Sequence, residues 1–500
     1  MSGTVYLVGA GPGDPGLLTL RAAELLRRAD VVVYDHLAFP GLLDLVREDA
    51  RIVYVGKEGA CHTLSQEGIS DLLVAEGRAG NSVVRLKGGD PYIFGRGGEE
   101  ALRLAEEGIA FEVVPGVSST CAAPAYAGIP LTHRDLSSQA VLVTGHERPD
   151  RDGSAHNWKA LAAIGTLVAV MGRERLPEIC RALTEAGKDP ATPAALVEWG
   201  TTPRQRTAEG TLADLPELAD SMGIRPPALF VCGPVVSLRG KLAWFERRPL
   251  WGRSVAVTRT RSQAGRLSAA LRELGARVEE RPVITLSEID PNPALDMAFS
   301  RLASYRWITF TSPNGAGIFL RRLFSRGLDA RSLARSRIAV IGPGTAEALR
   351  PYGLIPDLVP KAFVAEGLLE AFRGADPGEL LLARALKARD VLPEGLRAMG
   401  FSVEVLPLYE TGHPGPDPSW DPELTDLVTV TSASCAEGLA MSVQEGSRGG
   451  VRVASIGPVA SRAARDLGFR VAVESPASSI PSLVESITAY FRSGAAGPAG

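Results

Sequence analysis

Short apolar runs alternate along the first 245 residues with longer stretches in which apolar residues recur every three to four positions. The runs VYLVG and VVVYD are typical of buried strands, and the residues between them that share one helical face are Leu18, Ala22, Leu25, Leu26 and Ala29. Further strand-like runs are SVVRLKG, FEVVPG, AVLVTG, TLVAVMG and ALFVCG. This alternation predicts an α/β fold with a mainly parallel sheet and helices on its faces.

The pattern breaks near Leu242, where KLAWFERRPLWGR combines two tryptophans, a charge cluster, a proline and a glycine. We expect a domain of residues 1–246 and a linker of residues 247–252 there. A second α/β series follows, with the strand-like runs VAVTR, WITFTS, IAVIG, LLLAR, VEVLPLY, LVTVTS and VASIG.

The second series contains a weak internal repeat. WITFTSPNGAG followed by IAVIGPGTAEAL has a counterpart in LVTVTSASCAEG followed by VASIGPVASRAA, which predicts two similar lobes. Residues 493–500, SGAAGPAG, are small and are expected to form a disordered tail.

Composition and charge narrow the class of protein. The 500 residues are 45% hydrophobic with a formal net charge of −3, so non-specific binding to nucleic acid or a membrane surface is not expected. The chain starts without a signal-like segment and has no apolar run of spanning length, so we expect a cytoplasmic protein. Its five cysteines and six histidines show no disulfide or metal-ligand spacing, so no metal is expected.

The opening loop, VGAGPGDPGLLTL, fits the glycine pattern of a dinucleotide-binding turn, and Asp35 follows at the usual distance. However, Pro12 and Pro15 each remove a backbone donor that would hold a pyrophosphate. The loop by itself is therefore compatible with a nicotinamide dinucleotide, with another ligand, or with a purely structural turn.

Later motifs decide between these alternatives. RLKGGDPYIFGRGGEE, VVPGVSSTCAAPAYAGIPLTHR, VGKEGACHTLSQ and EWGTTPRQR occur in order over residues 3–246, which resemble the tetrapyrrole methylases, in particular the uroporphyrinogen-III C-methyltransferases. The resemblance implies two α/β subdomains that bind S-adenosylmethionine between them, and a homodimer. The glycines of the opening loop would then leave space beside a cleft, and the dinucleotide interpretation is disfavoured.

The same resemblance implies methylation of uroporphyrinogen III at C2 and C7 to give precorrin-2, with Asp35 as proton acceptor and Lys57 as proton donor. Without it, Asp35 reads as a turn cap and Lys57 as a solvated loop residue. The implied cofactor-binding residues are Pro12, Gly88, Gly89, Asp90, Ile93, Ser118, Ser119, Met171, Gly200 and Ala228. Arg96, His133 and Arg134 are candidate binders of substrate carboxylates.

Three of these residues differ from the usual family residue or allow a second interpretation. Family members often have threonine and alanine where this chain has Ser118 and Ser119, which keeps one hydroxyl and alters the packing. Met171 follows the apolar run VAV and could equally fill a core.

Residues 253–490 resemble uroporphyrinogen-III synthase. The ordered motifs are VTRTRSQAGRLSAALRELGA, WITFTSPNGAGIF, IGPGTAEAL, PDLVPKAFVAEGLL, LLARALKARDVL and EVLPLYET. The resemblance implies a two-lobed α/β domain of residues 253–492. One lobe would comprise 253–283 and 411–492, the other 287–407, with crossings at RPVITLSE and VLPLYET.

The implied reaction is cyclisation of hydroxymethylbilane to uroporphyrinogen III, with inversion of ring D and loss of water. Tyr409 matches a tyrosine proposed to assist departure of hydroxide, and otherwise reads as a packed aromatic. The candidate substrate-binding residues are Thr311, Ser312, Asn314, Thr345, Ser432 and Ser434, with Arg259 and Arg384 as carboxylate binders or turn caps. Ala460 stands where the family commonly has threonine, although Ser461 is adjacent.

Two other functions stay open at this point. The chain could be a methyltransferase for a later corrinoid intermediate, although KGGDPYIFGRGGEE is typical of the early-pathway enzymes. Alternatively, it could be a methyltransferase only, whose C-terminal half binds tetrapyrroles or docks a partner without catalysis.

Overall fold

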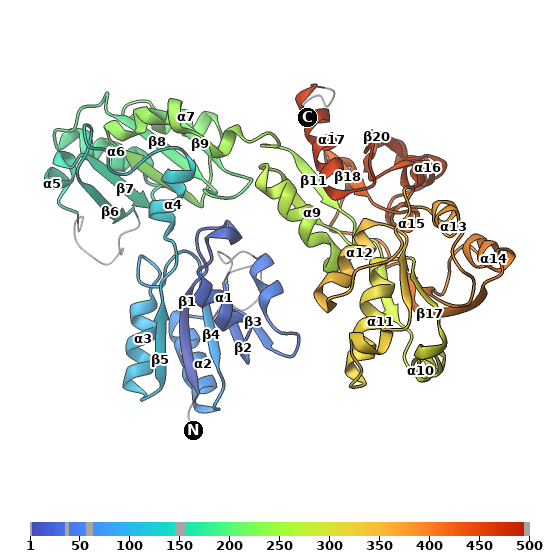
Figure 1. The fold of residues 1–500 in the computed structure, drawn as a ribbon. Helices are drawn as coiled ribbons and strands as arrows, with labels where there is room; N and C mark the ends of the chain where they lie inside the picture. Colours follow the sequence, from blue (N-terminus) through green and yellow to red (C-terminus); the bar gives the residue numbers. More distant parts are fainter. Residues whose placement is uncertain (1–2, 36–39, 57–63, 146–155, 495–500) are drawn as a thin grey trace. The chain divides into compact units, whose positions relative to one another are not determined.

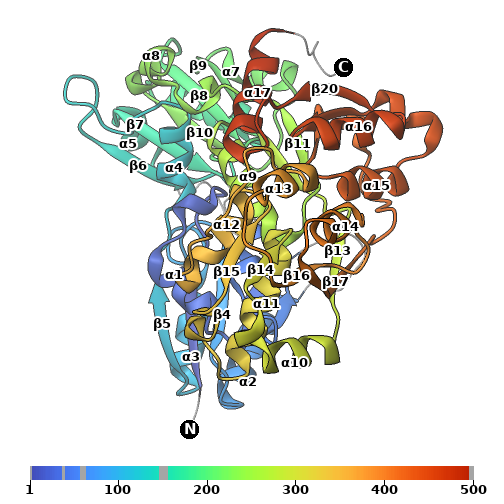
Figure 2. The ribbon, with the colours of Figure 1, turned by 45° about the vertical axis from the view of Figure 1, so that its right-hand side comes forward.

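The computed structural model describes residues 3–35, 40–56, 64–145 and 156–494 (Figures 1 and 2). The chain divides into two compact units, 1–252 and 253–500, which are called the first and second unit below. Each unit contains two five-stranded sheets, so the α/β class predicted from the apolar pattern is confirmed. Lys57 and most of the predicted disordered tail lie outside the described residues.

The first sheet of the first unit is parallel throughout, as its sequence pattern predicts, with strand order β3-β2-β4-β1-β5. Its elements are β1 (Thr4–Gly9), η1 (Pro15–Leu17), α1 (Leu20–Leu26), β2 (Val31–Tyr34), η2 (Pro40–Leu45), β3 (Arg51–Tyr54), α2 (Gln66–Arg78), β4 (Val83–Lys87), α3 (Gly97–Glu106) and β5 (Ala110–Val114). Thr19 and Ser65 cap the N-termini of α1 and α2. Apolar clusters lie on both faces of this sheet, which buries its central strands.

The second sheet of the first unit differs from the prediction because it is mixed, in the order β6-β7-β10-β8-β9. Its elements are α4 (Ser119–Tyr126), β6 (Ala140–Thr144), α5 (Trp158–Ala163), β7 (Thr166–Val170), α6 (Leu176–Glu185), β8 (Pro193–Glu198), β9 (Arg206–Thr211), α7 (Leu215–Ser221) and β10 (Ala228–Cys232). Only β6 and β7 pair in parallel. A short loop joins β8 directly to β9, too short for the crossover that a parallel pair needs, and β10 inserts antiparallel between β7 and β8.

The first unit ends in a series of short turns: η3 (Pro234–Leu238), α8 (Arg239–Leu242) and η4 (Phe245–Arg247). Phe245 and Leu250 are buried, so these residues pack within the first unit. Among the described residues of the chain, no helix is long and apolar enough to cross a bilayer.

In the second unit, one lobe holds a parallel sheet of order β12-β11-β18-β19-β20. Its elements are β11 (Ser254–Val257), α9 (Arg261–Glu273), β12 (Arg277–Glu280), η8 (Pro422–Leu424), β18 (Leu427–Val430), α15 (Ala433–Ser442), η9 (Glu445–Gly450), β19 (Arg452–Ser455), α16 (Pro458–Asp466), β20 (Arg470–Glu474) and α17 (Ile480–Arg492).

The other lobe holds a sheet of order β13-β17-β16-β14-β15. Its elements are β13 (Thr285–Glu288), α10 (Pro293–Ser300), η5 (Leu302–Ser304), β14 (Trp307–Phe310), α11 (Pro313–Ser325), η6 (Ala330–Leu333), β15 (Arg337–Val340), α12 (Pro343–Leu349), η7 (Arg350–Tyr352), α13 (Ala365–Ala371), β16 (Glu379–Ala385), α14 (Val391–Ala398) and β17 (Ser402–Gly412). Because β13 pairs antiparallel with β17 as far as Gly412, the chain leaves this lobe later than the sequence motif VLPLYET predicts.

The predicted repeat has a structural counterpart in the two lobes. β14, α11, β15 and α12 follow one another as β18, α15, β19 and α16 do, and each strand pair is parallel. Ser312 and Ser432 cap α11 and α15 in the same way, each accepting a hydrogen bond from a backbone N–H three residues later.

Candidate active sites

Three loops meet at the carboxyl edge of the first sheet of the first unit. The opening loop after β1 and the turn after β4 are joined by two hydrogen bonds, Gly89 N to Gly11 O at 2.7 Å and Gly11 N to Gly89 O at 3.2 Å. Gly116, after β5, lies so close that a Cβ there would stand 2.3 Å from Gly89 O. Only glycine fits at position 116, and the strand ends are held together backbone against backbone.

The Asp90 carboxylate organises this junction. Its Oδ1 accepts hydrogen bonds from Tyr92 N at 2.8 Å and Ile93 N at 3.1 Å, and its Oδ2 accepts one from Gly116 N at 3.0 Å. The side chain is buried, so each of these bonds is shielded from water. Asp90 therefore shapes the loop, and its carboxylate is occupied by backbone donors.

The N-terminus of α4 lies beside the same turn. A Cβ on Gly89 would stand 3.7 Å from Ser119 N, and Gly89 has a φ of 68°. The Ser118 hydroxyl caps α4 and also bonds Thr120 Oγ1 at 2.9 Å. Ser118 is thus the N-cap of α4, and Ser119 is the first residue of the helix.

Met171, Gly200 and Ala228 share one edge of the second sheet. Ala228 opens β10 opposite Glu198, the last residue of β8, while Leu229 pairs with Val170, the last residue of β7. Met171 and Gly200 closely follow these two strand ends. Met171 is 55% exposed, so its interpretation as a core filler is wrong.

Strained backbone marks the same loops. Among the described residues, the non-glycine residues with positive φ are Phe94, Arg96, Met171, Trp199 and Thr201, all in the first unit. Each is a predicted site residue or stands next to one. Left-handed conformations of this kind cost free energy and tend to persist where function requires them. The backbone thus singles out the loops that the sequence motifs indicate.

Asp35, at the end of β2, belongs to a buried charge cluster. Arg85 Nη2 donates to Asp35 Oδ2 at 3.0 Å, and Arg85 Nε lies 3.4 Å from Glu100 Oε1. Lys87 Nζ donates to the same Glu100 oxygen at 2.8 Å. Glu100 is fully buried and the Arg85 side chain is 3% exposed. Burial, and next the charge of Arg85, lower the pKa of Lys87.

The candidate carboxylate binders of the first unit are not brought together by the described contacts. Arg96 forms a bidentate pair with Glu99, with N–O distances of 3.0 and 2.7 Å. His133 bonds within its own turn, to Ser137 and to Asp135 N. Arg134 is exposed.

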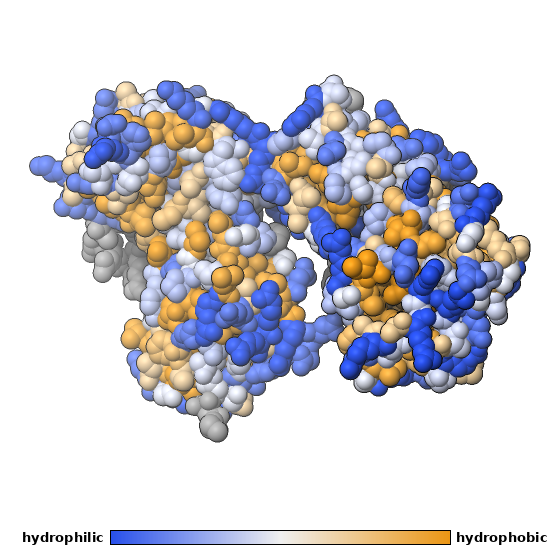
Figure 3. All heavy atoms as spheres, viewed as in Figure 1, coloured by the Kyte–Doolittle hydropathy of each residue, from blue (hydrophilic) through white to orange (hydrophobic). Residues whose placement is uncertain are grey.

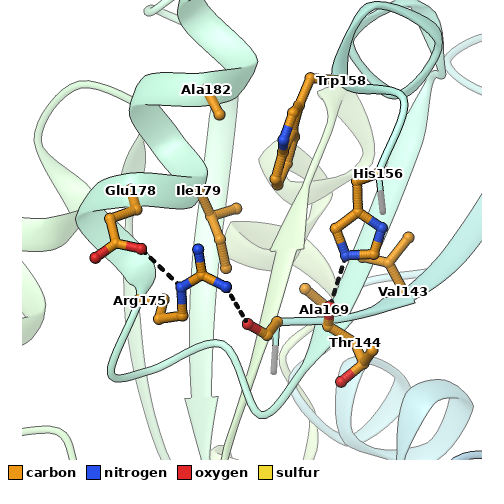
Figure 4. A pocket seen from close by; sticks show the side chains of 10 residues that line it. Val143, Thr144, His156, Trp158, Ala169, Arg175, Glu178, Ile179 and Ala182 are labelled. Carbon is orange, nitrogen blue, oxygen red and sulfur yellow. Dashed lines mark hydrogen bonds and ion pairs between the residues drawn. The ribbon is translucent and has the colours of Figure 1, made fainter. Parts of the chain in front are cut away.

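A small hollow of about 120 Å³ lies in the second subdomain of the first unit, the part that holds the sheet β6-β7-β10-β8-β9 (Figure 4). Arg175, which pairs with Glu178, and His156, whose Nε2 lies 2.8 Å from Thr144 O, stand on its walls. Sites for drug-sized ligands typically measure about 300–1,000 Å³. This hollow is therefore too small for S-adenosylmethionine, although it lies next to the Met171 loop.

In the second unit, Tyr409 and Ser312 meet at the carboxyl ends of β14 and β16. Their hydroxyl oxygens are 2.9 Å apart, and Asn314 also interacts with the Tyr409 hydroxyl. Tyr409 lies within β17 and is 5% exposed. Burial raises the pKa of Tyr409, and its hydrogen bonds with Ser312 and Asn314 partly offset this. Burial of Tyr409 therefore favours its neutral form over the phenolate.

Comparison with known proteins identifies both units. The model of the Tetrapyrrole (Corrin/Porphyrin) Methylases matches residues 4–216, and that of Uroporphyrinogen-III synthase HemD matches residues 265–485. The Porphyrin biosynthesis protein HemD of Ruminiclostridium josui is 40% identical over 496 residues, 97% of each chain. The chain belongs to this family of bifunctional tetrapyrrole biosynthesis enzymes. The first unit is its methylase unit and the second its synthase unit.

Further relatives match parts of the chain. The Uroporphyrinogen-III C-methyltransferase of Bacillus subtilis is 40% identical over 333 residues, which cover 66% of this chain and 68% of the relative. The crystal structure of Uroporphyrin-III C-methyl transferase from Thermus thermophilus with S-adenyl homocysteine is 44% identical, with a TM-score of 0.41. That likeness covers 47% of this chain and all of the other. Several sirohaem synthases match over about half of their own length.

The other predicted residues of the synthase unit fall into two groups. Thr311, Thr345 and Arg384 belong to the lobe that carries Tyr409, whereas Arg259, Ser432 and Ser434 belong to the other lobe. Arg384 Nη2 pairs with Asp390 at 2.9 Å, so its charge is already balanced within the lobe. Burial lowers the pKa of Arg259.

Ser461 does not replace the hydroxyl that is missing at Ala460. It is fully buried, and its hydroxyl bonds the Ser455 hydroxyl of β19 inside the lobe. Ala460 is buried as well. The two lobes of the synthase unit therefore differ here, because the corresponding position in the Tyr409 lobe is Thr345.

Sequence reasoning missed the partners of Asp35 in the methylase unit. Arg85, Lys87 and Glu100 all lie in the quoted motif RLKGGDPYIFGRGGEE. The available signal was the pair of basic residues in a strand whose other residues are apolar. Buried basic residues need anionic partners, and Glu100 on α3 provides one.

Proposed function

We propose that the methylase unit transfers methyl groups from S-adenosylmethionine to C2 and C7 of uroporphyrinogen III, which gives precorrin-2. The family match and the Bacillus subtilis relative support this activity. The observation that carries the proposal is the meeting of the opening loop, the Gly88–Asp90 turn and the start of α4 in a glycine-lined junction.

The residues present fit S-adenosylmethionine. Glycines 11, 89 and 116 bring bare backbone to the edge of the sheet, where ligands of α/β proteins bind. Ile93, on the loop after this turn, and Met171, directly after β7 in the second sheet, each offer an exposed apolar side chain. When bound, S-adenosylmethionine supplies a methyl group on a positively charged sulfur, a good leaving group. The protein's own contribution is then mainly to align this group with the ring carbon.

Asp35 is proposed as the acceptor of the proton that leaves the macrocycle. Arg85 fixes the carboxylate by a hydrogen bond at 3.0 Å, while about a quarter of the Asp35 side chain stays exposed toward solvent. Lys57 remains the candidate proton donor from sequence. Arg96, His133 and Arg134 are proposed to bind substrate carboxylates, and the planar guanidinium groups of the two arginines are suited to this.

We propose that the synthase unit cyclises hydroxymethylbilane to uroporphyrinogen III with inversion of ring D. The neutral Tyr409 hydroxyl donates a hydrogen bond to the departing hydroxide, and Ser312 and Asn314 orient it. Thr311, Thr345, Ser432 and Ser434, with Arg259, are proposed to hold the carboxylate-rich chain. Positioning is the main task, because the open chain also closes without an enzyme to the wrong isomer.

One assay tests both proposals. Hydroxymethylbilane is supplied with and without S-adenosylmethionine, and the isomer and the methyl content of the product are determined. We expect the dimethylated product with S-adenosylmethionine and the type III isomer alone without it. Type I isomer alone would remove the synthase proposal and leave a methyltransferase with a non-catalytic C-terminal half. Type III isomer without methylation would remove the methyltransferase proposal.

We also propose that the enzyme is a homodimer through the methylase unit. Large apolar side chains such as Leu20 and Leu102 are exposed there, and Figure 3 shows apolar surface on this unit. Sedimentation equilibrium of the full chain is expected to give twice the mass of 52.8 kDa. A monomer at micromolar concentration would contradict the proposal.

A further inference from the structure

The opening loop is tied to the second subdomain of the methylase unit at one point. Asp14 N donates to Thr201 Oγ1 at 3.2 Å, and a Cβ on Gly13 would stand 2.6 Å from Thr202 Cγ2. Asp14 lies two residues after Pro12, and Thr201 directly follows Gly200. These contacts therefore join the two loops that carry predicted methyl-donor residues from the two subdomains.

Tyr126, the last residue of α4, holds the other side of Asp14. Its hydroxyl donates to Asp14 Oδ2 at 2.8 Å, while Asp14 Oδ1 accepts from Gly16 N at 2.8 Å. Burial, and next the bond to Asp14, raise the pKa of Tyr126, so the phenol stays protonated as a donor.

The Tyr126 ring rests on the segment that precedes the domain junction. Its centroid lies 5.0 Å from that of Trp244 and 4.7 Å from that of Phe245. Phe245 in turn contacts Trp251 at 5.0 Å, and the Arg248 guanidinium lies 4.7 Å from the Trp244 and Phe245 rings. Aromatic pairs in these tilted arrangements are favourable beyond the area they bury.

A separate chain of hydrogen bonds connects the same segment with Thr201. Glu246 Oε1 accepts from Gln205 Nε2 at 2.8 Å, and Gln205 Oε1 accepts from Thr201 N at 2.9 Å. Arg239 pairs with the other Glu246 oxygen at 2.6 Å. Thr201 is 1% exposed with a φ of 70°, a strained conformation that persists only when its surroundings enforce it.

We propose that Tyr126 and Glu246 are positioning residues for the methyl-donor site, and that residues 244–251 form part of that site's support. Two independent contacts, one aromatic and one polar, run from this segment to the loops of Asp14 and Thr201. Loops fixed in advance bind a ligand more tightly, because less conformational freedom is lost on binding. The inference rests on the proposed function, since it assumes that Pro12 and Gly200 face S-adenosylmethionine.

The test is calorimetric titration of the full chain with S-adenosylmethionine. Tyr126→Phe keeps the ring stack and removes only the hydroxyl that bonds Asp14. Loss of one hydrogen bond to a charged group predicts a Kd about 10-fold higher, with a thermal unfolding profile close to that of the wild type. An unchanged Kd would overturn the inference.

The matched control is Tyr305→Phe in the synthase unit. The Tyr305 hydroxyl donates to Glu404 Oε2 at 2.7 Å, so the substitution makes the same chemical change far from the donor loops in sequence. We expect its Kd for S-adenosylmethionine to equal that of the wild type. An equal loss of affinity in both variants would show a general effect of losing such a bond and would contradict the positioning role.

A pair of variants at Thr201 separates positioning from folding. Thr201→Ser keeps the oxygen that accepts from Asp14 N, and Thr201→Ala removes it, at nearly the same backbone strain. We expect the serine variant to retain the wild-type Kd and the alanine variant to lose affinity as Tyr126→Phe does. Equal affinities of the two variants would overturn the inference. Absence of binding to the wild-type chain would instead remove the proposed methyltransferase function.

Discussion

The candidate sites of the methylase and synthase units differ in backbone conformation and in the charge of their side chains. In the methylase unit, left-handed non-glycine residues and a buried cluster of charges surround the site, whereas the described residues of the synthase unit contain no left-handed non-glycine residue. The synthase site instead uses a neutral phenol and hydroxyls at helix N-termini. Rigid backbone suits an in-line methyl transfer, which demands close alignment of three atoms. Neutral donors suit a flexible polyanion that must be folded into one conformation before it closes.

The substitution expected to separate the two units most strongly is Glu100→Ala in the buried charge cluster, which should destabilise the methylase unit alone. Without this carboxylate, Lys87 and Arg85 share only Asp35, and breaking a buried ion pair typically costs about 3–5 kcal/mol. We expect the methylase unit to unfold at lower denaturant concentration, while cyclisation of hydroxymethylbilane is kept. Glu99→Ala, at the exposed neighbouring position, is the control and should change the free energy of unfolding by less than about 1 kcal/mol. Equal effects of the two substitutions would contradict the role of the cluster.

The second prediction concerns Asp90. Asp90→Ala leaves three backbone N–H groups without their acceptor, so the loop that carries Ile93 loses its shape. Each lost bond to a charged group is worth about 1.5–3 kcal/mol, so binding of S-adenosylmethionine should fall below detection by calorimetry. Asp90→Asn, which keeps one carbonyl acceptor, should bind S-adenosylmethionine with an affinity between those of the wild type and Asp90→Ala. Full affinity in Asp90→Ala would remove this loop from the donor site.

The third prediction concerns Tyr409. Tyr409→Phe should slow type III formation about 10-fold and raise the share of type I isomer. A general acid typically contributes about 10²–10⁴-fold, and we expect less here because the open chain also ionises and closes unaided. Tyr352→Phe, in the same lobe, is the control and should leave the isomer ratio unchanged. Since the raised pKa keeps the phenol protonated, the wild-type rate should be level through neutral pH and fall only as pH rises past about 10. If the wild-type rate already falls as the pH rises toward 8, and Tyr409→Phe abolishes this fall, the phenol is not a neutral donor at neutral pH.

The smallest expected effect is the pH dependence of methylase stability. A lowered Lys87 pKa means that the folded state binds fewer protons than the unfolded state between the folded pKa and the ordinary value of 10.5. Stability should therefore rise with pH in that window, by at most about 1.4 kcal/mol per pH unit. Denaturant unfolding of the wild type and of Lys87→Met between pH 8 and 10 measures it. A steeper rise of stability with pH in Lys87→Met than in the wild type would contradict a lowered Lys87 pKa.

The alternation of apolar runs was sufficient to predict the α/β class, and the ordered motifs were sufficient to predict the family; both predictions are confirmed. The alternation failed for residues 140–232, because the same strand-like runs form parallel or antiparallel pairs and only the length of the connection decides. The β8–β9 loop contains no helix, and that was the missed signal.

The candidate residues were predicted from motifs, and their roles remain predictions. What motifs could not supply is what each side chain already contacts. The motif left Arg384 as either a carboxylate binder or a turn cap, and the structure pairs it with Asp390 of its own lobe. The Asp90 carboxylate is likewise taken up by backbone donors. Partners such as Glu100 lie on another element, so a linear pattern does not reveal that they bury a charge.

The aromatic contacts of Trp244, Phe245 and Trp251 bear on where the two units can be separated. Phe245 is buried and the two tryptophan rings lie against it, so this stretch packs with the methylase unit, whose boundary follows Gly252. A spacer inserted after Gly252 should therefore leave this packing intact, whereas one inserted between Trp244 and Trp251 should disrupt it.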